Sequence, residues 1–508
     1  MRRRIIVGFA LALIYAAFVL LIPHDTPRVI GLESDLTMMY INGAAAIDNM
    51  FAGHWSAGQP NLLWPDINPF TAHGLGYPIV LWTFAWPFTD PVPAWSYFTA
   101  AKLVSILASM AVIVLTVLWL GWFPGCIAVV SLFTRPLFFR LSYSGCTDLF
   151  VVALLLWAAY CLFRQRFMVA GLLYALAVLS RYEYLILLPF VALLIVKNPA
   201  PKEALATAED SRVADVGLRS GLMLAGRTLA SFIIPVLVLL AANFHIVGMP
   251  AANRGNLAIH FLEEIQYGYQ LTETVMEKYP SIWSILSADP GRTFNILTRD
   301  LWKTTAGLVT AQVVPVLFVG AVFCLFRRRD NRTWILFAAL SAHYLALNVF
   351  MSQSVNERFF ILEIIVLTWL GSSVFQHIKR WYLLALIPFL VLGLQQLGRE
   401  INTQTQRNTD GFLVLRDAMS ADNTILSMRP QLAFVAGTHW HYWKPGIQNI
   451  HLYCVENQID YLLWSSQEVF HQREFRDKFS STRAAFPDFS TVHADSNSGI
   501  LFKVNRLQ

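Results

Sequence analysis

Charged residues are scarce in this chain. Of its 508 residues, 56% are hydrophobic and only 14% are Asp, Glu, Lys or Arg, whereas a soluble globular chain carries about 25% charged residues. So few polar side chains cannot cover a water-facing surface. The composition therefore argues against an ordinary soluble protein and predicts a polytopic membrane protein.

Other features are missing as well. The five cysteines, at positions 126, 146, 161, 324 and 454, show no metal-like spacing, and four of them lie in or beside apolar runs. No disulfide framework is implied. No Gly-rich phosphate-binding loop, Gly-Ser linker or visible internal repeat is present. The formal net charge of +6 is concentrated in short loops, which fits membrane orientation better than nucleic-acid binding.

Long apolar runs are what the sequence does contain, and a membrane span needs about 20 such residues. "MRRR" and the run that follows it to Ile22 lack a small-x-small cleavage site, so they are interpreted as an uncleaved first span. Residues 123–141 predict a short span that stops early, near Arg135 and Arg140. The clear candidates are 5–22, 97–120, 147–163, 228–247, 306–326, 333–350, 360–376 and 382–396.

Residues 168–197 are ambiguous, because "SRYEY" (180–184) sits in the middle of the run. Basic clusters belong on the cytoplasmic side. One crossing would put "RRRDNR" (327–332) and "KR" (379–380) outside, whereas two crossings return every basic cluster to the cytoplasm. We therefore expect spans at 167–180 and 183–196 with Arg181 at the outer turn. The total is eleven spans, with the N-terminus inside and the C-terminus outside.

This topology predicts two units. Residues 1–396 form a mainly α membrane bundle with long outer loops at 23–96 and 248–304. Residues 397–508 have soluble composition and predict a small α/β extracytoplasmic domain. In that domain "NTILSM" (423–428), "IDYLLWSS" (459–466) and "SGILFKVN" (498–505) are typical of strands, and "GFLVLRDAMS" (411–420) of a helix.

The first outer loop opens with two carboxylates, Glu33 and Asp35, before an amphipathic stretch that includes Tyr40. Asp35 is well placed to cap a helix, and Glu33 to be a solvated loop residue. Fold alone does not require either acid, so a chemical role has to be weighed against these structural ones.

Other span ends also carry polar groups. Asp148 begins one span, Arg181 and Arg358 lie at the outer ends of others, and His73 and Tyr77 stand in "AHGLGYPIVLW". Each has a simple structural explanation: a helix cap, arginines that snorkel to the interface, a polar loop residue. Ionisable groups gathered at one membrane depth are nevertheless functional candidates by default. Carboxylates facing guanidinium groups suit transfer from a lipid phosphate, because a carboxylate can accept the acceptor's proton and arginine binds phosphate in a bidentate manner.

These motifs give the chain a family resemblance. The topology, with an acidic motif in the first outer loop, resembles that of the GT-C glycosyltransferases, which include the aminoarabinose transferases of lipid A and the protein O-mannosyltransferases. The supporting stretches are "ESDLTMMYINGAAAI" (33–47), "GYPIVLWTFAWPF" (76–88), "SGCTDLFVVALLLWAAYCLF" (144–163), "AGLLYALAVLSRYEYLILLPF" (170–190), "NERFFILEIIVL" (356–367), "NTILSMRPQLAFVAGTHWHYWKP" (423–445) and "IDYLLWSS" (459–466).

The resemblance implies a polyprenyl-phosphate sugar donor, an inverting transfer and a multi-pass protein of the bacterial inner membrane. It implies Asp35 as catalytic base, Asp148 and Glu33 as supporting acids, and Arg181 and Arg358 as ligands of the donor phosphate.

His73, Tyr77 and Tyr40 are expected to line the substrate site. The acceptor, a lipid or a glycan, is left open, and so is a divalent cation, because some relatives use one and others do not. The sequence also departs from the family pattern: the acids read Glu-Ser-Asp rather than Asp-Glu, and "HGLGYP" replaces a Lys-Pro. The donor sugar therefore cannot be carried over.

Three hypotheses remain at this point: a glycosyltransferase, a transporter or flippase for a lipid-linked or anionic substrate, and a non-catalytic scaffold. A carrier is expected to place its charges near the bilayer midplane, and a scaffold needs no shared site. The two His of "THWHYWKP" (438–445) are interpreted as part of an aromatic surface rather than a metal site.

Overall fold

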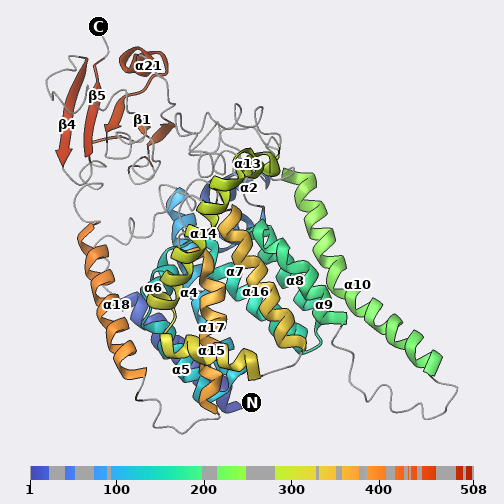
Figure 1. Ribbon diagram of the computed structural model, residues 1–508. Coiled ribbons are helices and arrows are strands. Elements are labelled where there is room, and N and C mark those ends of the chain that lie inside the picture. Colours follow the sequence, from blue (N-terminus) through green and yellow to red (C-terminus); the bar gives the residue numbers. More distant parts are fainter. Residues whose placement is uncertain are drawn as a thin grey trace.

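Helices make up most of the chain in the computed structural model (Figure 1). The structure describes residues 2–21, 40–51, 74–88, 93–196, 214–247, 281–327, 331–350, 357–376, 384, 386–407, 418–420, 422–427, 433, 436, 438–442, 449–464, 488–495 and 499–505. The helices of the first half are α1 (Arg2–Leu21), α2 (Asn42–Phe51), α3 (Gly76–Ala85), α4 (Pro93–Leu120), α5 (Trp122–Phe133), α6 (Pro136–Tyr143), α7 (Thr147–Phe163), α8 (Phe167–Ser180), the 3₁₀ helix η2 (Tyr182–Leu187) and α9 (Leu188–Val196). Those that follow are α10 (Ala214–Val247), α13 (Ile282–Ala288), α14 (Pro290–Gly307), the π-helix η4 (Leu308–Gln312), α15 (Pro315–Arg327), α16 (Asn331–Phe350), η5 (Glu357–Phe360), α17 (Ile361–Ser373), η6 (Val374–Gln376), α18 (Ile387–Arg407) and α21 (Ile450–Glu456).

The predicted membrane bundle is confirmed, and each of the eleven predicted spans coincides with helical structure. In a bilayer the backbone must satisfy its own hydrogen bonds, which long apolar runs do by forming helices. Three described helices are long and apolar enough to cross alone: Arg2–Leu21, Ser96–Leu120 and Leu229–Ile246. The count of eleven crossings stays a prediction, because the other apolar helices are shorter.

Two predicted spans are interrupted. The run 123–141 divides into α5 and α6, which meet at an angle of 80°. Arg135 is extended there and Pro136 begins α6, which fits the bias of a residue before proline away from helical angles. The run 306–326 divides between η4 and α15 at Val313, whose backbone is also extended. Proline at 315, the first residue of α15, has no N–H to continue the preceding helix.

The chain turns back at Arg181, where the two-crossing prediction placed a turn. The hydroxyl of Tyr174 on α8 donates to the carbonyl of Tyr184 over 2.7 Å. In one straight helix these residues would lie about 15 Å apart along the axis, so a hydrogen bond between them requires the chain to fold back. Arg181 itself has extended backbone angles.

The C-terminal residues form a five-stranded mixed sheet in the order β2-β1-β3-β5-β4. The predicted strands are confirmed as β1 (Thr424–Ser427), β3 (Tyr461–Trp464) and β5 (Gly499–Val504). Two strands were not predicted, β2 (His439–Tyr442) within "THWHYWKP" and β4 (Phe489–Asp495). β1 pairs parallel with β2 and β3, while β5 pairs antiparallel with β3 and β4. Most of the predicted helix 411–420 lies outside the described residues.

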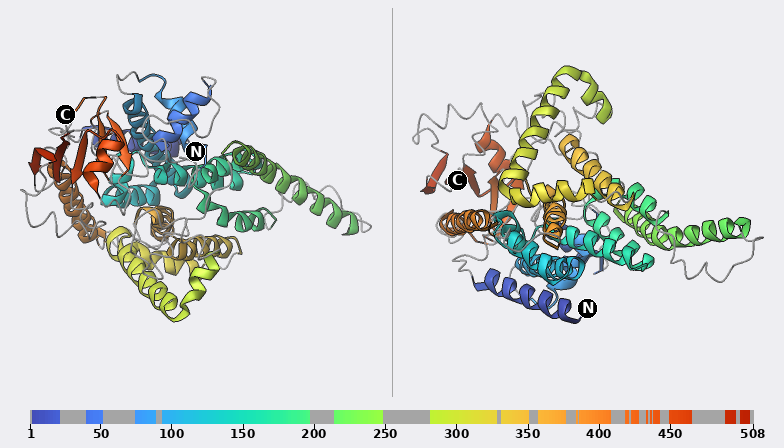
Figure 2. Two further views of the ribbon diagram at one scale, coloured as in Figure 1. Left: turned by 90° about the horizontal axis from the view of Figure 1, so that it is seen from above. Right: turned by 60° about the horizontal axis from the view of Figure 1, so that its bottom comes forward.

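One continuous cluster of buried side chains joins the sheet to the bundle. It contains Tyr40, Tyr77 and Phe98 from the helical part and Ile425 and Trp440 from the sheet. Figure 2 shows the sheet beside one side of the bundle, while α10 extends away from it in both views. The predicted domain boundary at 396/397 lies within α18, which continues through it without a break. The boundary stays a prediction.

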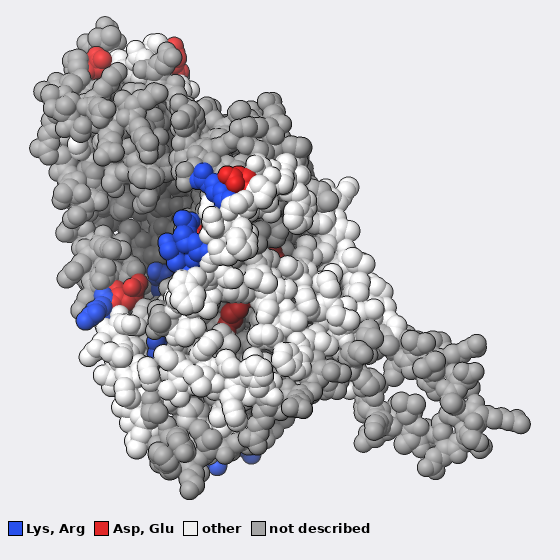
Figure 3. All heavy atoms as spheres, in the orientation of Figure 1, with Lys and Arg blue, Asp and Glu red and all other residues white. Residues whose placement is uncertain are grey.

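The sheet and the chain's N-terminus lie at opposite ends of the bundle in Figure 1. The described helices in Figure 3 are mostly white, and most blue and red side chains lie along the left of this white area, with a few red atoms inside it. A largely uncharged surface of this kind suits contact with lipid.

Candidate functional site

Arg181 is the centre of the candidate site. It is 4% exposed, and its guanidinium donates to the Asp148 carboxylate through Nη1 and to Glu183 Oε1, 2.5 Å away, through Nε. Asp148 lies in the first turn of α7 and is also buried. A buried charge is tolerated when it is paired and hydrogen-bonded, so Asp148 and Glu183 hold Arg181 in one orientation.

Arg358 approaches from a distant part of the chain. It belongs to η5, is 7% exposed, and its Nη1 lies 3.9 Å from Cys146 Sγ. The guanidinium carbons of Arg358 and Arg181 each lie 4.8 Å from the centroid of the Phe359 ring. The Phe359 ring therefore bridges the two guanidinium groups, because a cation is attracted to the π face of an aromatic ring.

The turn before α7 forms a second side of the site. Gly145 has φ = +74°, a conformation that glycine adopts without strain. Its carbonyl accepts a 2.7 Å hydrogen bond from the Tyr77 hydroxyl, and Tyr40 and Thr147 join their hydroxyls at 2.9 Å. The rings of Tyr40 and Tyr77 meet edge to face with centroids 5.1 Å apart. Both tyrosines therefore position the turn that carries Cys146 and Asp148.

Asn243 ties the chain before Tyr77 to the Arg181 turn. Its side-chain oxygen accepts from the Leu75 backbone N–H at 2.9 Å, and its amide nitrogen donates to the Tyr182 hydroxyl at 2.7 Å. A Cβ on Gly74 would lie 2.4 Å from the carbonyl oxygen of Leu179. Only glycine permits this close approach, which explains the first glycine of "HGLGYP".

The structure thus brings together five of the predicted site residues: Asp148, Arg181, Arg358, Tyr77 and Tyr40. Tyr40 lies just before α2, Tyr77 on α3, Asp148 on α7, Arg181 directly after α8 and Arg358 in η5. The other three, Glu33, Asp35 and His73, lie outside the described residues. The arrangement holds two guanidinium groups, the cations best suited to an anionic ligand, while the hydroxyls of Tyr40 and Tyr77 are engaged by Thr147 and Gly145.

A buried pair of ionisable residues was not predicted. His343 on α16 and Glu363 on α17 are 0% and 5% exposed, and His343 Nδ1 lies 2.6 Å from Glu363 Oε1. The His343 ring stacks on Tyr184, with centroids 4.7 Å apart. The sequence could have indicated this pair, because each residue is ionisable and lies inside a predicted span. Such residues are functional candidates.

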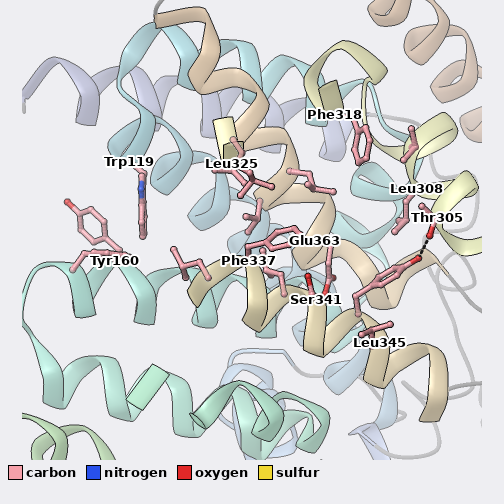
Figure 4. A pocket seen from close by; sticks show the side chains of 18 of the residues that line it. Trp119, Tyr160, Thr305, Leu308, Phe318, Leu325, Phe337, Ser341, Leu345 and Glu363 are labelled. Carbon is pink, nitrogen blue, oxygen red and sulfur yellow. Dashed lines mark hydrogen bonds between the residues drawn. The ribbon is translucent and has the colours of Figure 1, made fainter. Parts of the chain in front are cut away.

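Glu363 also lines a cavity of about 950 Å³ between the helices. Its lining is largely apolar (Figure 4), and the hydroxyls of two lining residues, Tyr344 and Thr305, hydrogen-bond over 2.7 Å. Arg4 and Arg164 line it as well. A second, apolar cavity of about 410 Å³ shares Trp119, Leu340 and other residues with the first. Apolar cavities of this size suit hydrocarbon ligands.

The described residues do not form an evident metal site. Among the described residues, no three His, Cys, Asp or Glu side chains are grouped so that they could hold a metal ion. The two histidines of β2 have separate surroundings: His441 Nε2 lies 2.8 Å from the Tyr453 hydroxyl, while His439 lies two positions away on the same edge strand.

The fold matches solved structures over nearly its whole length. The crystal structure of ArnT from Cupriavidus metallidurans in the apo state matches with a TM-score of 0.51 and 12% identity, covering 98% of this chain and 97% of that chain. A crystal structure of the same protein bound to undecaprenyl phosphate gives a TM-score of 0.49 and 10% identity with the same coverage.

No family model matches the sequence, and no curated protein matches it. The first of the two structural matches confirms the predicted GT-C-like fold, a multi-pass membrane bundle followed by a small sheet domain.

Proposed function

We propose that this protein is an integral-membrane glycosyltransferase of the bacterial inner membrane. It moves a sugar from a polyprenyl-phosphate donor to a lipid or glycan acceptor on the extracytoplasmic face. The observation that carries the proposal is the meeting of Arg181 and Arg358 on Phe359, beside Asp148 and the two tyrosines. The GT-C-like fold supports it.

The two arginines bind the donor phosphate. Arg181 is already paired with Asp148 and Glu183, so its orientation is fixed, while Arg358 provides a second guanidinium. As the bond from the anomeric carbon to the phosphate oxygen breaks, the phosphate takes the electron pair and gains negative charge. Preorganised cations stabilise that developing charge.

Asp35 acts as the general base. The acceptor hydroxyl attacks the anomeric carbon from the face opposite the phosphate and inverts it, and its proton passes to the Asp35 carboxylate. Asp35 precedes Tyr40 of the site by five positions in the sequence. Glu33 and Asp148 support the charge balance, and Tyr40, Tyr77 and His73 line the substrate.

The 950 Å³ cavity supports a lipid-borne substrate, because its apolar lining between α16 and α17 suits a hydrocarbon chain. Arg4 and Arg164 in its lining also fit a carrier that passes an anionic lipid between leaflets. The alternative function is therefore a transporter or flippase for a lipid-linked or anionic substrate. The charged cluster favours the enzyme, since it lies where α7 begins and α8 ends.

The test compares envelope lipids and glycans of a deletion strain after complementation. The wild-type gene should restore products heavier by one sugar residue, while Asp35→Asn and Arg358→Ala should not, at equal protein level in the membrane. Asp48→Asn is the matched control, because Asp48 is exposed and its carboxylate accepts a hydrogen bond from the Trp82 indole N–H. Full restoration by Asp35→Asn would refute the proposed base, and unchanged sugar content in the deletion strain would favour the carrier.

A further inference from the structure

Two arginines line the large cavity far from the proposed phosphate site. Arg4 on α1 and Arg164, which directly follows α7, both belong to the lining of the 950 Å³ cavity. Asp148 of the candidate site lies in the first turn of the same helix, so Arg164 is about 24 Å from it along the helix axis, at about 1.5 Å per residue. The cavity arginines therefore form a second cationic group, separate from Arg181 and Arg358.

An aromatic pair connects the two cavity arginines. Arg4 Nη1 donates to the backbone carbonyl of Leu118 on α4 over 3.4 Å, and Trp119 is the next residue of that helix. The rings of Trp119 and Tyr160 have centroids 5.9 Å apart, and the guanidinium carbon of Arg164 lies 5.3 Å from the centroid of the Tyr160 ring. Trp and Tyr beside basic residues are typical of the level of lipid head groups in a bilayer.

The cavity extends from this aromatic pair into an apolar interior. Figure 4 shows Trp119 and Tyr160 at one end of the cavity and Thr305 and Leu308 at the other. The second cavity, of about 410 Å³, adjoins the first, because both are lined by Trp119, Phe163, Leu336, Leu340, Val366 and Leu370. Two adjoining apolar spaces beside one cationic end suit a lipid with one head group and two hydrocarbon chains.

We propose that Arg4 and Arg164 bind the phosphate of a two-chained anionic phospholipid whose hydrocarbon chains occupy the two cavities. A guanidinium group stays charged throughout the physiological pH range, and its fork matches the oxygens of a phosphate. Both side chains are exposed as well as lining the cavity, so a head group can reach them. The predicted topology places this end of the cavity in the cytoplasmic leaflet.

This site differs from that of the proposed sugar donor. One lipid phosphate cannot contact Arg164 and the Arg181–Arg358 pair together, because α7 separates them by its length. The apolar part of the cavity can also admit a donor chain, so the assignment depends on which lipid the arginine end prefers. The inference goes beyond sugar transfer and does not require it.

Basic residues at this side of the bundle are expected from membrane orientation alone, and Arg166 provides the comparison. It is exposed and lies in the same turn as Arg164, between α7 and α8, but it is not among the residues that line either cavity. A lipid held in the cavities should therefore depend on Arg4 and Arg164 and be insensitive to Arg166.

The test uses purified full-length protein in phosphatidylcholine nanodiscs that contain a trace of a photoreactive lipid. One probe is phosphatidylglycerol with a diazirine at the end of one acyl chain, and the other is phosphatidylcholine with the same chain, in which a choline cation offsets the phosphate charge. Mass spectrometry locates the crosslinks, which are expected in the cavity-lining parts of α15, α16 and α17. Each arginine beside an anionic head group contributes about fivefold in affinity, so the anionic probe should label these segments at least about tenfold more strongly.

The variants separate the cavity arginines from general positive charge. Arg4→Gln combined with Arg164→Gln should reduce the preference for phosphatidylglycerol to within about threefold. Arg166→Gln removes one charge from the same turn and should keep the wild-type preference. Unlabelled phosphatidylglycerol should compete with the probe, whereas sodium phosphate at the same concentration should not, because it has no chains to fill the cavities.

Equal labelling by the two probes in the wild type would overturn the proposal, and this result needs no variant to fold. A wild-type preference in the Arg4/Arg164 double variant, or its loss in Arg166→Gln, would also overturn it. Competition by a polyprenyl phosphate at a lower concentration than phosphatidylglycerol would assign the arginines to the carrier lipid instead. Sugar transfer is measured separately: transfer without the lipid preference refutes only this site, and the preference without transfer refutes only the enzyme.

Discussion

Arg181 and Arg358 share one aromatic ring, with each guanidinium carbon 4.8 Å from the centroid of Phe359. Arg181 ends α8 and Arg358 lies in η5 before α17, so the ring joins two distant segments. Both arginines are buried, which strengthens an interaction that exposure would weaken.

Replacing the shared ring tests this relationship. Phe359→Leu removes both cation–π contacts, each of which contributes about 0.5–2 kcal/mol. We expect a lower melting temperature in detergent and weaker binding of a prenyl phosphate. Phe359→Tyr keeps the ring and is the control, and identical behaviour of the Leu and Tyr variants would contradict the prediction.

The buried ion pair gives a second prediction. Arg181→Gln leaves the Asp148 carboxylate buried without its cation and should lower the free energy of unfolding by about 3–5 kcal/mol. Adding Asp148→Asn removes that charge and should recover part of the loss. Denaturation of the single and double variants measures the coupling. If the change in the free energy of unfolding of the double variant equals the sum of the changes in the two single variants, the pair is not coupled.

Helix packing at Gly371 gives a third prediction. A Cβ there would lie 2.0 Å from the carbonyl oxygen of Leu317 on α15, so Gly371→Ala forces α15 and α17 apart and should destabilise the protein by about 1–3 kcal/mol. Gly398 on α18 is the matched control, because nothing lies within 4 Å of its Cβ position among the described residues. Gly398→Ala should be neutral or stabilise by up to about 1 kcal/mol. Equal melting temperatures for the two variants would show that the close approach is unimportant.

Cys454 gives a pH-dependent prediction in the sheet domain. Burial raises the pKa of its thiol to about 12, whereas an unfolded cysteine has a pKa of about 8.5. The native state then holds its proton while the unfolded state loses it, so this contribution to stability is full below about pH 8.5 and is lost as the pH rises toward 12.

Cys454→Ala should flatten that part of the stability profile. Mass spectrometry after maleimide treatment at pH 8 should find Cys454 unlabelled in native protein and labelled after denaturation. Rapid labelling of the native protein would contradict the prediction.

Much of the architecture was predictable because it follows from local rules. The apolar runs predicted the helices, since a bilayer leaves the backbone no other partner. The basic clusters predicted the reversal at Arg181, because charge orientation decided between one crossing and two. Short apolar stretches in a segment of soluble composition predicted β1, β3 and β5, whereas the aromatic and histidine content of "THWHYWKP" concealed β2.

The sequence by itself determined that this is a helical membrane protein and which span ends carry charge, because hydropathy and charge position are properties of single segments. Only the tertiary structure decided which of those charges meet. Phe359 between two arginines, Tyr77 on the Gly145 carbonyl, and Glu363 with His343 in a cavity wall all join segments far apart in the chain. Such partnerships depend on how helices rotate and cross, and the spacing of residues within one helix does not encode them.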